Sequence, residues 1–287
     1  MNASFHPKEE YRDMKTFKEP GKLRKWCRDR SRDGAKIALV PTMGYLHEGH
    51  LSLIAEAARR GADEIVVSIF VNPTQFGPKE DYAKYPRDEK ADLAKCRKAG
   101  ATAVFLPTPE AMYPAGHSTY VVEEDLSKGL CGARRPGHFR GVCTVVAKLF
   151  NIVRPDFAVF GQKDFQQSRV VRRMVRDLDF GIEIVVAPIV REASGLAKSS
   201  RNTYLTDAER EAATVLNRAL CGVKPGKSAA AERRRVSAEI EKAGLRTDYV
   251  EFVDSETLRP VAKTGAGTCA LVAAFAGKTR LIDNRLI

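Results

Sequence analysis

The amino-acid sequence predicts an α/β fold, in which a doubly wound parallel sheet is followed by a smaller α+β C-terminal domain. Up to about residue 190, short apolar runs that suit buried strands alternate with segments of helical periodicity, a pattern typical of parallel sheets. Beyond that point the alternation stops. A chain of 287 residues is long enough for one large or two modest domains. We therefore expect one domain over 1–189 and a smaller one over 190–287.

The first domain is expected to contain most of the alternating elements. Residues 1–13 are polar and expected to fray, and a helix over 16–32 leads into a strand at 37–40. Leu51, Ile54 and Ala58 then recur at helical spacing, and Gly61 suits a C-cap. The remaining elements are expected as a strand at 64–71, a helix ending near 98, strands at 103–106 and 120–122, a helix at 141–153, a strand at 157–160, a helix at 165–178 and a strand at 182–190.

The second domain is expected to differ in pattern. Two helical segments, 207–220 and 228–243, are separated by a turn rich in Gly, Pro and Lys. Two strand-like runs follow at 249–253 and 268–275. Helices first and strands afterwards indicate an α+β arrangement.

Composition excludes several classes of protein. No apolar run reaches membrane-spanning length, and the charged N-terminus lacks the apolar core of a signal peptide, so we expect a cytoplasmic protein. The six cysteines form no CxxC pair and are expected to be reduced. The net charge of +12 fits either nucleic acid or small anionic substrates. Acids interspersed among the cations, and the lack of an RNA-binding signature, favour small anions, with no nucleic acid or membrane partner.

The most informative stretch is PTMGYLHEGH at 41–50, between a predicted strand and a predicted helix. A helix N-terminus offers free N–H groups and a positive dipole end to a phosphate. Gly44 and Gly49 allow close approach of a ligand to the backbone. His47 and His50 are equally compatible with ordinary polar residues at a helix start. Zinc is disfavoured because no further ligand lies nearby at suitable spacing.

Three further polar clusters follow predicted strands or connections. Asn72 and Gln75 offer amides, 161–167 offers a cation, an acid and more amides, and 191–202 offers hydroxyls and cations on a loop. Each cluster alone is typical of a solvated turn. Together with the histidine pair they predict two phosphate-binding stretches and a polar pocket, which is what nucleotidyl transfer requires.

These stretches resemble a known enzyme family. HxGH at 47–50 and KSSR at 198–201 are similar to the paired signatures of the HIGH/KMSKS nucleotidyltransferase superfamily. The fuller set narrows the resemblance to the pantothenate synthetase (pantoate–β-alanine ligase) family from about residue 14 onward: PTMGYLHEGH, FVNPTQF, YPR, RPGHFRGV, FGQKDFQQ, GLAKSSRN, DYVEFVD and RLIDN. This family condenses pantoate with β-alanine, using ATP and Mg²⁺, through a pantoyl-adenylate. The resemblance implies a Rossmann-like catalytic domain, a C-terminal lid and a cytoplasmic homodimer.

The resemblance also implies roles for matching positions. Catalytic roles fall to His50, His47 and Lys163, with His50 as the proton donor. Pantoate and β-alanine would meet Gln75 and Gln167, with Asn72 and Tyr85 nearby. ATP would be bound by Met43, Gly44, Tyr45, Leu46, His47, Glu48, Gly49, His50, Gly161, Gln162, Lys163, Asp164, Val190, Lys198, Ser199, Ser200 and Arg201. The resemblance does not assign the Mg²⁺ ligands.

Two positions depart from the family pattern. Ser194 occupies a usual Asp, and Lys198 stands where Met is usual. Lys198 is expected either to reach the ATP phosphates or to stay in solvent. Two alternative functions remain open: a nucleotidyltransferase that leaves the nucleotide on its product, and a basic nucleic-acid-binding protein. AMP release that depends on β-alanine would separate the first from the ligase, and a salt-dependent shift of RNA or DNA would indicate the second.

Overall fold

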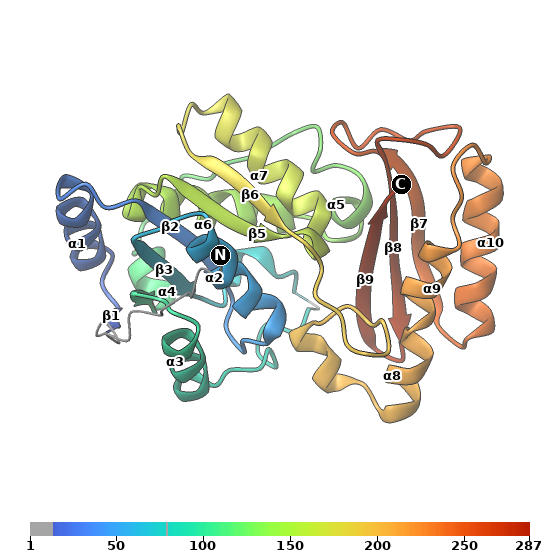
Figure 1. Ribbon diagram of the computed structural model, residues 1–287, viewed down its shortest axis with the longest axis horizontal. Coiled ribbons are helices and arrows are strands. Elements are labelled where there is room, and N and C mark those ends of the chain that lie inside the picture. The colour runs from blue at the N-terminus through green and yellow to red at the C-terminus, as the bar shows by residue number, and fades with distance from the viewer. Residues whose placement is uncertain (1–13, 79) are drawn as a thin grey trace, which may run out of the picture.

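The computed structural model describes residues 14–78 and 80–287. Its larger sheet has six strands in the order β1-β4-β3-β2-β5-β6 (Figure 1). Every neighbouring pair in it is parallel, which confirms the predicted fold class. The strands are β1 (Lys15–Phe17), β2 (Ile37–Thr42), β3 (Glu64–Ile69), β4 (Ala103–Phe105), β5 (Phe157–Gly161) and β6 (Glu183–Ala187).

Helices cover both faces of this sheet because its strands are apolar on both sides. In β2, Leu39 belongs to the core shared with α1, α6 and α7, whereas Val40 belongs to the core shared with α2 and α3. Successive strand residues point to opposite faces, so one apolar run contributes to both cores. The helices are α1 (Pro20–Arg32), α2 (Glu48–Arg59), α3 (Glu89–Lys98), α6 (His138–Val153) and α7 (Phe165–Asp177).

Strand β2 lies at the point where the chain changes direction across the sheet. β3 pairs with one edge of β2 and β5 with the other. In open α/β sheets, ligands bind beyond the carboxyl ends of the strands at such a point. The segments that leave this edge are the turn before α2 and the short helices η1 (Pro73–Gln75) and η2 (Gln162–Asp164).

The C-terminal part forms a second, antiparallel sheet in the order β7-β8-β9, drawn in red in Figure 1. One face of this sheet shares a core with α9 and α10, and the other packs Val253 and Leu271 against Phe165 of α7. The domain boundary at residue 190 stays a prediction. The elements are η3 (Ser200–Tyr204), α8 (Asp207–Ala213), α9 (Val215–Cys221), α10 (Ala229–Lys242), β7 (Arg246–Asp254), β8 (Thr268–Ala276) and β9 (Thr279–Leu286).

Three expected elements were wrong in detail. Residues 15–17 are strand β1, paired with β4, so the first helix begins only at Pro20, where a proline suits the first turn. Residues 120–122 form no strand, and the Val121 N–H donates instead to the Thr144 hydroxyl (3.0 Å). The helix expected over 207–220 is divided at Thr214 into α8 and α9. The expectation for residues 1–13 lies outside the described residues.

Besides the short helices η1, η2 and η3, one strand and two further short helices were not expected. Strand β9 pairs with β8 through a tight turn at 276–279. The short helices α4 (Pro109–Met112) and α5 (Leu130–Arg134) interrupt segments that carry little helical periodicity. Helix α5 and the turn after it bring arginines toward the C-terminal sheet, where the Arg134 Nε lies 3.3 Å from Asp248.

All six cysteines are free thiols. Cys27, Cys96, Cys143 and Cys269 are buried, and burial raises the pKa of each thiol to about 12, which keeps them unreactive. Within residues 14–78 and 80–287, no helix combines the length and the apolar character needed to cross a bilayer.

Candidate active site

A cavity of about 190 Å³, here called the main cavity, lies at the carboxyl ends of β2, β3 and β5. Most residues that the sequence pointed to line it: Met43, His47, Gly49, His50, Asn72, Gln75, Tyr85, Gly161, Lys163, Asp164, Gln167, Val190, Lys198, Ser199, Ser200 and Arg201. Five others do not: Gly44, Tyr45, Leu46, Glu48 and Gln162. The fold therefore gathers segments that are up to 158 residues apart in the chain, from Met43 to Arg201.

The two histidines cap helix α2 as a reciprocal pair. His47 is the N-cap, and its Nδ1 accepts a hydrogen bond from the Gly49 N–H (3.1 Å). The Nδ1 of His50 accepts from the His47 N–H (3.3 Å). A Cβ at position 49 would lie 2.9 Å from the His47 ring, so glycine is needed there. Because Nδ1 accepts in both neutral rings, each carries its proton on Nε2 and keeps a free N–H donor.

Both histidines are uncharged near neutral pH. Burial, followed by the charge of Lys163, lowers the pKa of His47 to about 4. Burial, then proximity to His47 and Lys163, lowers the pKa of His50 to about 3. The resemblance implies that these side chains stabilise charge at a phosphate. The structure indicates how they can do so: as neutral Nε2–H donors rather than as cations.

The turn before α2 is held by Asp92 of α3, which the sequence did not single out. The Asp92 carboxylate accepts the backbone N–H groups of Tyr45 and Leu46, both at 2.7 Å. Gly44 has a φ of 85°, and a Cβ there would lie 2.9 Å from Ile69. Residues 44–46 therefore shape the turn, although they do not line the main cavity. No local signal marks Asp92, since it lies 46 residues from Leu46 in the chain.

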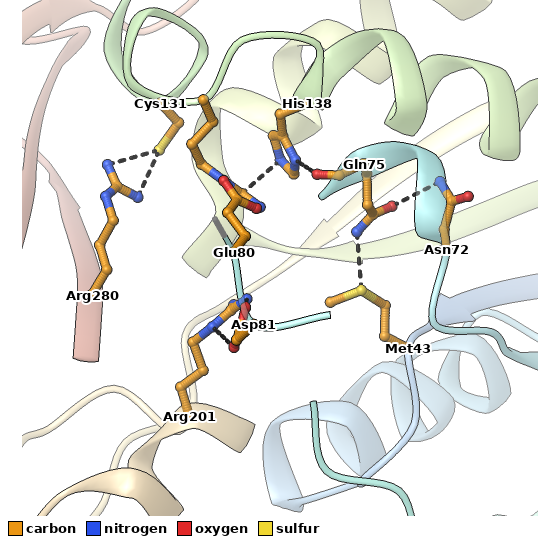
Figure 2. Close-up of polar contacts among 10 residues, drawn as sticks. Met43, Asn72, Gln75, Glu80, Asp81, Cys131, His138, Arg201 and Arg280 are labelled. Atoms are coloured by element: carbon orange, nitrogen blue, oxygen red, sulfur yellow. Dashed lines mark hydrogen bonds and ion pairs between the residues drawn. The ribbon is translucent and has the colours of Figure 1, made fainter. Parts of the chain in front are cut away.

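Two cations and one acid from η2 and η3 also line the main cavity. The Lys163 ammonium is 3.1 Å from the Asp164 carboxylate. Burial opposes ionisation of Asp164, but Lys163 and then Arg201 outweigh it and lower its pKa. Arg201 donates from Nε and Nη2 to both oxygens of Asp81, at 2.9 and 2.8 Å (Figure 2).

Two glutamine amides also line the main cavity, and they differ in how firmly hydrogen bonds hold them. The Gln75 Nε2 contacts the Met43 sulfur (2.9 Å), and its Oε1 accepts from Asn72 (3.2 Å), as Figure 2 shows. Asn72 is buried and also accepts from the Tyr113 hydroxyl (2.8 Å), so it positions Gln75. Gln167 lines the cavity, and its side-chain amide forms no hydrogen bond with another residue in the described ranges.

Apolar side chains form another part of the cavity wall. It consists of Phe70, Phe160 and four residues of α6: Val142, Val145, Val146 and Leu149. The helical periodicity over 141–153 predicted that this face is buried, but not that part of it borders a cavity. At the start of α6, the His138 Nδ1 bonds the Gln75 carbonyl oxygen (2.9 Å), and burial, followed by the charge of Arg135, lowers the His138 pKa to about 4.

Lys198 forms an ion pair on the cavity border, and which of its two expected states it takes toward ATP stays a prediction. Its ammonium lies 2.7 Å from the Glu48 carboxylate, at the N-terminus of α2. The Ser200 hydroxyl donates to the Tyr45 carbonyl oxygen (3.2 Å), which gives the loop a second contact with the histidine turn. This loop therefore covers one side of the main cavity.

The loop is ordered without an acid at position 194. The Glu192 N–H donates to the Leu196 carbonyl oxygen (2.8 Å), which closes the turn around Ser194. Arg191 binds both oxygens of Asp283 in β9, at 2.6 and 2.9 Å. The departure at Ser194 is thus compatible with a closed loop.

The described residues contain no cluster of three or more histidine, cysteine or acidic side chains that could hold a metal ion. Asp164 is the acidic side chain in the lining of the main cavity. Mg²⁺ retains waters and is commonly bound by one or two carboxylates together with substrate phosphates. This donor set fits a Mg²⁺ ion that arrives with a nucleotide, and it does not fit a metal held by protein side chains alone.

The chain is similar in sequence to known proteins over almost its whole length. Residues 15–286 match the family model described as pantoate-beta-alanine ligase. A pantothenate synthetase of Myxococcus xanthus is 56% identical over 273 residues, covering 91% of this chain and 92% of that protein. One of Thermosipho melanesiensis is 53% identical over 279 residues, covering 96% and 99%.

Solved structures give the same result. The crystal structure of pantothenate synthetase from Thermus thermophilus superposes with a TM-score of 0.87 at 46% identity, covering 95% of this chain and 99% of that one. Pantoate-beta-alanine ligase from Francisella tularensis, complexed with beta-gamma ATP and beta-alanine, gives 0.81 at 32% identity, covering 95% and 97%. The chain therefore belongs to the pantoate–β-alanine ligase family.

Proposed function

We propose that this chain catalyses the ATP-dependent condensation of (R)-pantoate with β-alanine, which yields pantothenate, AMP and pyrophosphate through a pantoyl-adenylate. The observation that carries the proposal is the composition of the main cavity. Neutral N–H donors and cations for phosphate, amides, and an apolar wall border one space. Its relatives named pantothenate synthetase support the same reaction.

In the first step, a pantoate carboxylate oxygen attacks the α-phosphorus of ATP, and the bond to the bridging oxygen breaks to release pyrophosphate. A carboxylate with a reference pKa of about 4 is already ionised, so no general base is needed. The chain's contribution is therefore electrostatic. Lys163, the Nε2–H groups of His47 and His50, and the N-terminus of α2 stabilise the developing charge.

Pantoate binding falls to the amide side of the main cavity. Gln167 is free to bind a carboxylate or hydroxyl, and Gln75 is held in place by Asn72. The wall formed by Val142, Val145 and the residues beside them suits the methyl groups of pantoate, because burying apolar surface there is favourable. Tyr85 borders the same cavity and is buried.

The remaining positions are proposed to hold ATP. The turn 43–50, the segment 161–164, Val190 and the loop 198–201 surround the cavity or shape its border. Mg²⁺ would be held by Asp164 together with the phosphates. When bound, it would offset the charge of the departing pyrophosphate.

In the second step, the amine of β-alanine attacks the carbonyl carbon of the adenylate, and the bond to AMP breaks. A primary amine has a reference pKa of about 10, so it must lose a proton first. With pKa values of about 4 and 3, His47 and His50 are too weak as bases to keep that proton. We infer that the amine binds in its minor neutral form. After the attack its nitrogen carries one proton more than the amide does, and this proton passes to solvent.

The finer organisation is also a proposal. Residues 190–287 would act as a lid, because the loop 198–201 belongs to this part and contacts the α2 turn through Lys198 and Ser200. The enzyme is proposed to be a cytoplasmic homodimer. The exposed Tyr120 and Val122 offer apolar surface that a second copy could cover. Light scattering of the purified protein tests the dimer.

Product identification tests the reaction. Purified protein is incubated with ATP, Mg²⁺, pantoate and β-alanine, and products are quantified by mass spectrometry. We expect equal amounts of pantothenate and AMP, formed only when β-alanine is present. A nucleotide that stays attached to pantoate in the presence of β-alanine would instead support a nucleotidyltransferase. No turnover of ATP would reject both.

A further inference from the structure

A second cavity of about 840 Å³, here called the outer cavity, lies between the segment 80–84, the turn after α5 and the C-terminal sheet. Six cationic and four acidic side chains line it. Arg201 lines the outer cavity, the main cavity and a small cavity of about 50 Å³ that lies between them. A single arginine thus forms a wall common to the reaction site and to the outer cavity.

Two of the arginines along this path, Arg135 and Arg201, bind carboxylates in a bidentate manner. Arg135 donates to both oxygens of Glu80, at 2.8 and 2.7 Å, as Arg201 does to Asp81. Both carboxylates come from one short segment. Arg280 follows, bound to Asp248 at 2.8 Å (its contact with Cys131 is drawn in Figure 2). Because bidentate arginine sites accept carboxylate and phosphate alike, Glu80 and Asp81 occupy positions that phosphate oxygens could take.

Two lysines at the outer cavity have no such partner. Lys84 and Lys278 both line it and are both exposed. Neither ammonium group forms an ion pair or hydrogen bond with another described residue. Their charge is therefore uncompensated by any contact and is available to attract an anion from the path.

We propose that the outer cavity receives the inorganic pyrophosphate product and forms its exit, separate from the entry of ATP. The inference rests on the proposed function, since pyrophosphate is released in the first step. Pyrophosphate that leaves Lys163 first contacts Arg201 and then Arg135 and Arg280. There it replaces the carboxylates of the 80–84 segment as the partner of the arginines. The uncompensated charge of Lys84 and Lys278 draws it outward. Its departure prevents the adenylate from reverting to ATP.

The test measures the reverse of the first step, in which pyrophosphate must enter through the outer cavity to react with the adenylate. Pre-formed enzyme-bound pantoyl-adenylate is mixed with inorganic pyrophosphate, and ATP formation is followed. The variant Lys84→Gln/Lys278→Gln removes the two lysines without breaking any ion pair. We expect the second-order rate constant for pyrophosphate to fall roughly three- to tenfold at low salt, within the range that electrostatic steering provides. The difference should shrink as salt rises.

The control is Lys128→Gln/Lys263→Gln, which makes the same charge change at two exposed lysines outside the outer cavity. It should behave as the parent does. In both double variants, kcat/KM for ATP should stay unchanged. An unaltered pyrophosphate rate in Lys84→Gln/Lys278→Gln, an equal loss in the control, or an equal loss for ATP would each overturn the proposal. Failure of the proposed function is distinguishable, because the parent would then form no adenylate at all.

Discussion

The Lys198 ammonium lies 2.7 Å from the carboxylate of Glu48, the first residue of helix α2. This contact joins the loop over the main cavity to the helix that carries His50. An anion at a helix N-terminus is favourable by itself, so both the helix dipole and Lys198 stabilise the Glu48 carboxylate. The positive charge that Lys198 brings near the proposed nucleotide site is therefore already compensated.

Lys198→Met is expected to leave ATP affinity equal or slightly higher. The exposed ion pair with Glu48 contributes only about 0–1 kcal/mol, and the methionine restores apolar cover beside the nucleotide. ATP affinity of the two proteins is compared by calorimetry at low and moderate salt. Glu48→Gln provides the matched control, since it breaks the same pair and leaves the lysine. A clear loss of affinity in Lys198→Met at low salt, closing as salt rises, would show that Lys198 binds the phosphates.

His50→Gln should separate catalysis from helix capping. Glutamine at the third helical position can still accept the His47 N–H, so the cap is retained, while the imidazole N–H is replaced by an amide N–H on a different framework. Loss of one preorganised donor commonly lowers a rate by about 10²–10³, and we expect that loss in adenylate formation. Thermal unfolding should change little. A variant with normal adenylate formation would remove His50 from the proposed chemistry.

Gln167→Ala is expected to raise KM for pantoate with little change in ATP binding. A hydrogen bond to a charged group contributes about 1.5–3 kcal/mol, which corresponds to a roughly 10- to 100-fold effect. The adjacent Gln166 is the contrasting control, because its amide bonds the carbonyl oxygens of Leu126 and Gly129. Gln166→Ala should lower the melting temperature instead. Equal weakening of ATP and pantoate binding in Gln167→Ala would indicate general damage to the site.

The lowered pKa of His50 predicts how the free energy of unfolding changes with pH. The folded pKa of His50 is about 3, below its ordinary value of 6.5, so the unfolded chain binds the proton more readily. The free energy of unfolding that His50 contributes is therefore constant above about pH 6.5 and is lost as pH falls toward the folded value. Urea unfolding of parent and His50→Gln between pH 7.5 and 5 measures this. The parent should lose more stability than the variant; parallel curves would contradict the assigned neutral state.

Much of the fold could be predicted because its signal is local. The strand at 37–40 and the helix after Glu48 follow from apolar runs and helical spacing, and they were confirmed. Strand β1 has only three residues and is defined by its pairing with β4 rather than by its composition. Strand β9 contains polar residues such as Asp283 and Asn284, which hide its strand pattern in the sequence. They are buried by contacts with residues distant in the chain.

In the candidate site, too, some residues could be predicted from the sequence and others could not. His47, His50, Lys163 and Gln167 stood out because their residue types match a reaction. Asp92 did not, because its role in shaping the turn depends on packing against α3. The pairs of Arg201 with Asp81 and of Arg135 with Glu80 join residues 120 and 55 positions apart, so no spacing rule reveals them. Many of the residues that line the main cavity were thus predictable, and the residues that support them were not; the roles in the reaction stay predictions.

The central claim is that pantoate is activated as an acyl-adenylate, and oxygen transfer tests it most directly. Pantoate labelled with ¹⁸O in both carboxylate oxygens is converted by the purified protein with ATP, Mg²⁺ and β-alanine. The carboxylate oxygen that attacks the α-phosphorus leaves with AMP when the amide forms. We predict that one ¹⁸O atom appears in AMP for each pantothenate formed, and that the other stays in the amide carbonyl. Unlabelled AMP, or formation of ADP in place of AMP, would contradict the account.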